Sequence, residues 1–436
     1  LGFGIVLALS TPAVGRAEPL TLADALARAR ATHPRLDAAR AAEQEAAQRE
    51  RQARAGFYPR IDVSEEWQRG DQPVFVFGSL LAERRFAVEN FAIDALNHPA
   101  AVDNLRTSVG LEQLVFDGGA TSHGVRAAEL MRRSSRLATE RASLDLTLEV
   151  STTYAAVLRL ESQVSAADRA IASAESDLGR ARDRRDAGLA TDADVLALDV
   201  HLAEAQSTRA TALADLLGAR ARLNDAIGAP LDLTFELDAG RRGDAIAALG
   251  SIETLEKEAL ERRPDVRQAA LAVELAENTT RASRAAWLPQ VGVLAGWEFN
   301  GGSLASQSSS WLVGTRIRLN LFRGFADAAR VEEARGAERR QRAERDRIER
   351  AARVEVRTAV ARLDAALGRQ RLGRATLARA REAERIVRDR YENGLATVTD
   401  LLRAADAVSE AESLDLTADV EAWLQAVTLD HAVGRQ

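Results

Sequence analysis

The chain has 436 residues, of which 28% are charged and only 4% are aromatic, and its formal net charge is −6. Both signs of charge are interspersed, which argues against the basic face that a nucleic-acid-binding protein needs. There is no cysteine, so disulfides, thiolate metal sites and cysteine nucleophiles are excluded. This composition suits long solvent-exposed helices better than a compact core of large side chains.

The first residues indicate export from the cytoplasm. Residues 1–10 form a short apolar run, and Gly15 and Ala17 place small side chains where a signal peptidase cleaves. We predict that residues 1–17 are a partial signal peptide, with a buried helix as the alternative. No later stretch approaches the ~20 consecutive apolar residues of a transmembrane helix, so any membrane contact has to be made by strands.

The two halves of the chain repeat each other. His33-Pro34 and Arg263-Pro264 lie 230 positions apart, whereas the identical Gly-Leu-Ala-Thr segments at 188–191 and 394–397 lie 206 apart. The difference of 24 positions indicates an insertion in the first half. The predicted divisions are a first structural repeat at 18–228, an equatorial inter-repeat segment at 229–250 and a second structural repeat at 251–436.

Each repeat is predicted to contain the same series of elements. The first has a helical stretch, a strand hairpin at 59–116, a long helix at 120–186 and a return helix at 192–227. The second has a helix at 251–287, a strand hairpin at 289–322, a long helix, a tip at 393–397 and a return helix. Alternating Leu231, Leu233, Phe235 and Leu237 predict a short strand between the repeats.

The helix predicted at 120–186 is unusually long. It contains no proline and would extend roughly 100 Å at ~1.5 Å per residue. A plain coiled coil is the alternative, but it leaves the hairpins and the paired turns unexplained.

The hairpins alternate apolar and polar side chains with a period of two, which is typical of strands with two different faces. Each run is about 11 residues long, the length of a tilted membrane-spanning strand. Trp67, Trp297 and Trp311 fall at the loop ends, where an interfacial aromatic girdle would lie. A half-buried hairpin in a soluble domain is the alternative, but no other strands are available to build a second layer.

Four strands are too few to close a barrel in lipid, where an open edge would leave backbone groups unsatisfied. The smallest single-chain membrane barrels use about eight strands, so several copies have to share one wall. The predicted fold is therefore mainly α-helical with a small transmembrane β-barrel shared between copies, and the copy number stays open at this point.

The duplicated order of segments resembles the TolC family of outer-membrane efflux proteins. The Phe116-Asp117-Gly118-Gly119 junction and the two Gly-Leu-Ala-Thr-x-x-Asp turns carry the resemblance, which covers residues 20–436. It implies a homotrimer in the outer membrane, with a twelve-stranded barrel that continues into a long periplasmic α-helical barrel containing most of the mass. It further implies a passive exit duct for small-molecule efflux or type I protein secretion. The expected partners are a periplasmic adaptor (membrane fusion) protein and an inner-membrane transporter of the RND, ABC or MFS type.

The resemblance also implies a role for the two turns between long and return helices. By this resemblance the tips contact the adaptor through Gly188, Leu189, Thr191, Gly394, Leu395 and Thr397. Glycine at 188 and 394 is expected independently, because a tight reversal needs a residue with positive φ. Thr191 and Thr397 are expected to cap the return helices. A merely structural role is the alternative.

A periplasmic gate is implied by the same resemblance. Asp400 matches the first acidic residue of a pore-narrowing ring that binds cations, and Arg403 stands where a second aspartate is expected. Tyr391 and Asp194 match partners in a hydrogen-bond network that holds the helices shut. Ala396 departs from that network, where an arginine is expected. We predict that Arg403 pairs with Asp400 or with a neighbouring protomer and weakens cation block, while solvated surface charges are the alternative.

The insertion lies between the first two strands, at 71–104, and is expected to be an extracellular loop. Its apolar stretches at 73–77 and 86–93 predict that it folds over the barrel mouth or packs on a neighbour.

No catalytic chemistry is predicted. The five histidines are scattered without ligand-like spacing, and no phosphate-binding glycine loop or nucleophile elbow occurs, so neither a metal nor a cofactor is expected. The alternative function is a surface-anchored coiled-coil structural or adhesive protein, which would require hairpins that do not enter the membrane.

Overall fold

The computed structural model describes residues 18–238 and 250–435. The predicted signal peptide, 1–17, and part of the predicted inter-repeat segment, 239–249, lie outside the described residues. The elements of the first half are β1 Glu18–Leu20, α1 Leu22–Thr32, α2 Pro34–Arg54, η1 Ala55–Phe57, β2 Arg60–Gly70, α3 Pro73–Ala82, η2 Val88–Phe91, α4 Ile93–Asn97, β3 Val102–Phe116, α5 Ala120–Asp186 and α6 Asp192–Ala226. Those that follow are β4 Phe235–Leu237, α7 Ile252–Arg262, α8 Pro264–Ser283, η3 Arg284–Trp287, β5 Gln290–Gly301, β6 Ser308–Arg318, α9 Ala326–Glu392 and α10 Val398–Val433.

The same series of elements occurs twice. Helices α5 and α9 each have 67 residues, and α1 and α7 each have 11. The return helices α6 and α10 have 35 and 36 residues. Two compact units cut across this duplication. The helical unit comprises the described residues 18–41, 136–238, 250–268 and 346–435, and the sheet-bearing unit comprises residues 42–135 and 269–345. Each unit therefore contains corresponding pieces of both repeats.

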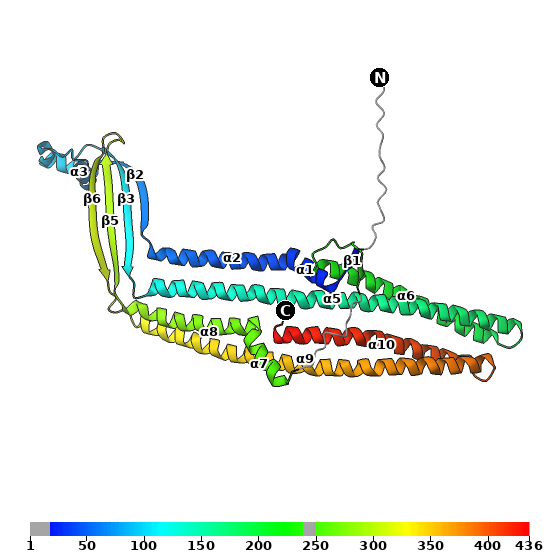
Figure 1. The fold of residues 1–436 in the computed structure, drawn as a ribbon. Coiled ribbons are helices and arrows are strands. Elements are labelled where there is room, and N and C mark those ends of the chain that lie inside the picture. The colour runs from blue at the N-terminus through cyan, green and yellow to red at the C-terminus, as the bar shows by residue number, and fades with distance from the viewer. Residues whose placement is uncertain (1–17, 239–249, 436) are drawn as a thin grey trace, which may run out of the picture. The chain divides into compact units, whose positions relative to one another are not determined.

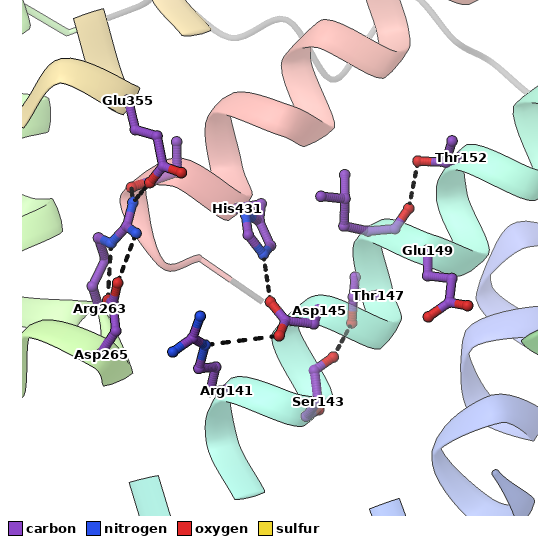
Figure 2. A network of polar contacts seen from close by, with 12 residues as sticks. Arg141, Ser143, Asp145, Thr147, Glu149, Thr152, Arg263, Asp265, Glu355 and His431 are labelled. Atoms are coloured by element: carbon purple, nitrogen blue, oxygen red, sulfur yellow. Dashed lines mark hydrogen bonds and ion pairs between the residues drawn. The ribbon is translucent and has the colours of Figure 1, made fainter. Parts of the chain in front are cut away.

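The continuous helix predicted at 251–287 is wrong, because the chain breaks at Arg263-Pro264. Pro264 has no backbone N–H and pushes the preceding residue out of the helical conformation, and Arg263 has φ −57° and ψ 125°. The Arg263 side chain is nearly buried and pairs with Asp265 at 2.9 Å and with Glu355 (Figure 2). Its guanidinium also donates to the carbonyl oxygen of Ala432 at 3.0 Å, so the break is held by three partners.

The helical unit also contains a small parallel sheet. Strands β1 and β4 pair, with Leu20 opposite Leu237. Leu20 is fully buried, and the Tyr154 hydroxyl lies 2.9 Å from its carbonyl oxygen and 2.8 Å from that of Asp238. The strand predicted around 231–237 is confirmed in its second half, at β4. In the same unit, His431 of α10 lies 2.9 Å from the Asp145 carboxylate of α5 (Figure 2).

The sheet-bearing unit has four antiparallel strands in the order β2-β3-β5-β6, lying side by side in Figure 1. The sheet is open, with β2 and β6 as its edge strands. The register places Val63, Val109, Trp297 and Trp311 in one row across the sheet. That face, the apolar face, is mostly hydrophobic. The opposite face, the polar face, includes the Ser64–Ser108 hydrogen bond at 2.7 Å and the Arg106–Glu298 ion pair.

The three tryptophans of the predicted girdle all lie on the apolar face. Their exposed fractions are 64% for Trp67, 52% for Trp297 and 74% for Trp311. Large apolar side chains so exposed in an isolated chain indicate a surface that another apolar phase or partner covers. Within residues 18–238 and 250–435, no helix is sufficiently long and apolar to cross a bilayer.

The insertion at 71–104 is not a simple loop. It forms α3, η2 and α4, and Pro73 stands at the first position of α3, where a missing N–H costs nothing. Phe77, Phe86 and Phe91 make two edge-on ring contacts with centroids 4.7 and 5.0 Å apart. The apolar stretches therefore build a small helical subdomain.

Candidate functional site

The candidate site comprises the two hairpin turns of the helical unit, where α5 turns into α6 and α9 turns into α10 (Figure 1). Gly188 has φ +77° and Gly394 has φ +73°, which confirms the positive φ expected at both positions. The Gly188 N–H donates to the Arg185 carbonyl at 2.8 Å, and the Gly394 N–H donates to that of Tyr391 at 3.0 Å. Both long helices therefore end in the same left-handed cap.

Each return helix begins with a capping box. Thr191 and Thr397 accept a hydrogen bond from the backbone N–H of Asp194 and Asp400, at 3.2 Å in both turns. The two aspartates reciprocate, accepting from the threonine backbone at 2.9 and 3.0 Å. The expected threonine N-caps are confirmed, and the carboxylates of Asp194 and Asp400 have a structural role in their own turns.

Each turn presents one large apolar side chain. Leu189 is 69% exposed and Leu395 is 68% exposed. Behind them lies a small core in which Leu178 and Leu198 pack against Val398 and Leu402, so the two hairpins are held together by apolar contact. The two exposed leucines therefore lie on the solvent side of this core and are free to contact another molecule.

Tyr391 lies just before the second turn and is buried against the first hairpin. The Arg184 guanidinium lies over its ring, 5.2 Å from the centroid, and donates to the Glu392 carbonyl at 2.6 Å. The Tyr391 hydroxyl has no hydrogen-bond partner within the part of the chain that the structure describes. Burial raises the pKa of Tyr391, and the negative charges of Asp194 and Asp177 act in the same direction, against the lowering effect of Arg184. Asp194 acts on Tyr391 electrostatically, but among the described residues no hydrogen bond joins the two side chains, so the network that would hold the helices shut stays a prediction.

Asp400 lies at the exposed start of α10. Hydrogen bonds from the Thr397 hydroxyl and backbone, and then the positive charges of Arg403 and Arg390, lower the pKa of Asp400 below its ordinary value of 3.8. Among the described residues no ion pair within 4 Å joins Arg403 to Asp400, so Arg403 affects Asp400 only by longer-range electrostatic attraction. A pairing of Arg403 with a neighbouring protomer stays a prediction.

The sequence reasoning missed a charged cluster that joins the two long helices. Asp177 on α5, nearly buried, accepts from Arg388 on α9 at 3.3 Å and from Arg180. Arg388 also pairs with Glu384 at 2.6 Å. The only signal in the sequence is the high density of charged residues. Which of them pair depends on the faces that α5 and α9 turn toward each other, and the sequence does not specify this.

A cavity of about 840 Å³ opens beside this cluster, between α5, α6, α9 and α10. Small side chains, mostly alanine and serine, line much of it, together with His201 and Glu412. Arg169 and Arg381 pair with Glu412 at 3.4 and 2.5 Å. No group of three or more His, Asp or Glu side chains that could hold a metal is found in residues 18–238 and 250–435.

Comparison with known proteins decides the family. The model of the outer membrane efflux protein family matches residues 25–229 and 255–435. The chain belongs to that family. The resemblance to the TolC family is thereby confirmed, as is localisation in the outer membrane. The family consists of outer-membrane channel proteins and not of enzymes.

Individual relatives are distant but cover most of the chain. The outer membrane efflux protein BepC of Brucella suis is 23% identical over 343 residues, covering 75% of this chain and 71% of BepC. Protein CyaE of Bordetella pertussis is 28% identical over 309 residues, covering 70% of this chain and 65% of CyaE, just under two thirds of its length. The solved outer membrane protein VceC from Vibrio cholerae superposes with a TM-score of 0.80 at 18% identity, covering 95% of this chain and 96% of VceC. At that identity the likeness to VceC establishes the fold alone.

Proposed function

We propose that three copies of this chain form a passive exit duct in the outer membrane. A periplasmic adaptor would dock on the helical unit, and an inner-membrane transporter of the RND, ABC or MFS type would supply energy and choose the cargo. The cargo would be small molecules or a protein secreted by the type I route. The observation that carries the proposal is the open four-stranded sheet with an exposed apolar face.

The strand order supports closure between copies. All neighbours in the sheet are antiparallel, so β2 and β6 at its two edges run in opposite directions. β6 of one copy can therefore pair with β2 of the next in the same antiparallel pattern. Three copies would give a twelve-stranded barrel with no edges, its apolar face and tryptophans toward lipid and its polar face toward the lumen.

The turns are proposed to serve as the adaptor contact. Gly188 and Gly394 set the reversals, Thr191 and Thr397 fix the start of the return helices, and Leu189 and Leu395 would be the apolar contacts. The exposure of both leucines supports this assignment.

The periplasmic gate is proposed to lie just inside these turns. Asp400 of each copy would contribute to an acidic ring, with Arg403 reducing its affinity for cations, while Tyr391 and Asp194 would help to hold the helices shut. Asp400 is exposed at the start of α10, which supports its access to cations in such a ring.

The test of the duct is assembly followed by conductance. The purified protein should run as an oligomer that dissociates only on heating, and should form channels in planar bilayers. A detergent-free soluble rod would instead support the adhesive alternative. Trivalent cations added on the gate side should block weakly, Arg403→Asp should strengthen the block, and Asp400→Asn should abolish it. Strong block in the unmodified protein would contradict the role given to Arg403.

A further inference from the structure

The two strand hairpins differ sharply in what connects their strands. Residues 302–307 join β5 to β6, whereas residues 71–101 join β2 to β3 and contain α3, η2 and α4. The longer connection, here called the mouth insertion (residues 71–101), has no counterpart in the second repeat. Its contacts with the sheet therefore indicate a role that the duplicated scaffold does not need.

One side of α3 is buried against the sheet. Val76, Ser79 and Glu83 are 4%, 4% and 3% exposed, and their spacing places them along one face of the helix. Val74, on another side, is 87% exposed. The Ser308 hydroxyl on β6 donates to the Glu83 carbonyl at 2.8 Å, which fixes the end of α3 to the sheet.

The covered surface is the loop end of the polar face. By the register, Asn104, Asn300 and Ser308 all point to that side. Asn104 and Asn300 are only 7% and 3% exposed, and the Asn104 amide donates to the Asn300 side-chain oxygen at 3.2 Å. The tryptophans of the apolar face remain exposed, so the mouth insertion covers one face and leaves the other bare.

A second attachment follows α3 directly. Arg84 has φ 56°, a left-handed conformation that glycine adopts far more readily than arginine. Its side chain donates to the Ser309 carbonyl at 3.0 Å. Arg84 accepts a strained backbone conformation and makes a hydrogen bond to β6. This combination indicates that the hydrogen bond to the sheet has a function that offsets the strain.

We infer that the mouth insertion is a constriction built into the outer opening of the duct, which sets the upper size of the solutes that pass. The inference rests on the proposed function, in which the polar face lines the lumen. A helix seated on the lumenal side of the wall removes cross-section from the pore, and every copy of the chain contributes one. The size limit would then be set at the outer mouth as well as at the periplasmic gate.

The placement of the mouth insertion can be tested without changing it. Because the chain has no cysteine, Asn300→Cys and Leu304→Cys each carry a single thiol, one under the insertion and one in the short loop, where Leu304 is 74% exposed. A membrane-impermeant maleimide should modify Asn300→Cys at least about tenfold more slowly than Leu304→Cys in the full chain. Equal rates would overturn the inference.

The effect on passage is tested by shortening the connection. Replacing residues 71–101 with the sequence of residues 302–307 should remove the protection of Asn300→Cys. When both chains also carry Tyr391→Ala, which removes a side chain proposed to hold the periplasmic gate shut, the shortened chain should have a single-channel conductance at least about twofold higher, since pore conductance follows the narrowest cross-section. Arg84→Gly keeps the length of the insertion and its left-handed turn but loses the bond to Ser309, and should produce a smaller increase. Val88→Ser, on an exposed part of the insertion, is the matched control and should change neither measurement.

The outcomes separate this inference from the proposed function. If the unmodified protein forms no channels, the duct fails, while thiol protection still reports whether the insertion covers the sheet. If the full-length and shortened chains that both carry Tyr391→Ala conduct equally, the constriction is wrong and the duct stands. Should the shortened chain not assemble, unchanged conductance in Arg84→Gly together with rapid modification of Asn300→Cys would overturn the constriction.

Discussion

The two hairpin turns of the helical unit share their backbone design and differ in the side chains around it. Gly188 and Gly394 occupy equivalent positions with nearly equal φ, and the two Thr–x–x–Asp capping boxes make the same hydrogen bonds. Tyr391, however, corresponds to Arg185 in the first turn, and Arg403 corresponds to Ala197. Arg185 pairs with Asp186 at 2.7 Å, whereas Tyr391 is buried beneath Arg184.

The difference indicates which requirements a turn imposes. A left-handed cap and an N-cap tolerate few residue types, so both copies keep them. The residues one helical turn away are under no such restriction and can diverge. Tyr391 and Arg403 of the proposed gate therefore occur only in the second turn, whereas Asp194 and Asp400 occupy the same position in both.

The largest effect should come from the shared glycines. Gly188→Val and Gly394→Val should each destabilise their own turn by about 1–2 kcal/mol, because a side chain disfavours positive φ. No atom lies within 4 Å of a Cβ built at either glycine, so the cost is conformational and not steric. Hydrogen exchange of the turn peptides measures it, and Asn at the same positions should cost less. Equal effects of Val and Asn would contradict this reasoning.

Removal of the caps should have a smaller and equal effect in both turns. Thr191→Ala and Thr397→Ala each lose two hydroxyl bonds, one accepted from the aspartate N–H and one donated to its carboxylate. Loss of such a cap costs about 1 kcal/mol and should speed hydrogen exchange in the first turn of α6 and α10 to the same degree. Ser at either position preserves the hydroxyl and serves as the control. Unequal effects would break the equivalence of the two turns.

Acid should affect the second turn in a way that depends on Arg403. Since the pKa of Asp400 is lowered in the folded protein, its stabilising contribution is complete above the ordinary value of 3.8 and is lost as pH falls through the folded pKa. In Arg403→Ala the pKa of Asp400 should move back toward 3.8. The pH range between the folded pKa and 3.8, over which the stabilisation is lost, should therefore become narrower. An NMR titration of the Asp400 carboxyl carbon, assigned with Asp400→Asn, measures the shift. An unchanged pKa would show that Thr397 and Arg390 lower the pKa of Asp400 without a contribution from Arg403.

The smallest effect is expected for the Tyr391 hydroxyl. Tyr391→Phe should change stability by less than about 0.5 kcal/mol, since in the described chain this hydroxyl bonds to nothing. Tyr391→Ala also loses the packing beneath Arg184 and should cost several times more. Thermal dissociation of the proposed oligomer measures both changes in stability. A marked loss in Tyr391→Phe would show that a neighbouring copy supplies the missing partner.

Much of the fold could be predicted because it depends on local patterns. The long helix at 120–186 was predicted with the bounds that the structure gives it, since an uninterrupted proline-free stretch ends at a turn with glycine. The four strands follow from their alternation within a few residues. The prediction failed at Arg263-Pro264, where the effect of proline on the preceding residue outweighed the helical pattern on either side.

Other features depend on distant partners and left no local trace. The segment Pro73–Phe77 is rich in valine and phenylalanine, which fit a strand as well as a buried helix, and only its contact with the sheet favours the helix. The Asp177–Arg388 pair joins residues far apart in a chain full of both charges. Of the candidate site, the turn geometry could be predicted from residue types, whereas the burial of Tyr391 depends on how two hairpins pack.

The bare edges of the four-stranded sheet have a consequence for the life of a newly made chain. β2 and β6 present unpaired backbone groups, and the tryptophan-bearing face beside them is uncovered. A single chain with such a sheet can add a strand from another polypeptide, and it aggregates readily in water. In the proposed assembly, biogenesis would therefore depend either on a chaperone that shields the sheet during transit or on association of copies that is faster than incorrect strand pairing.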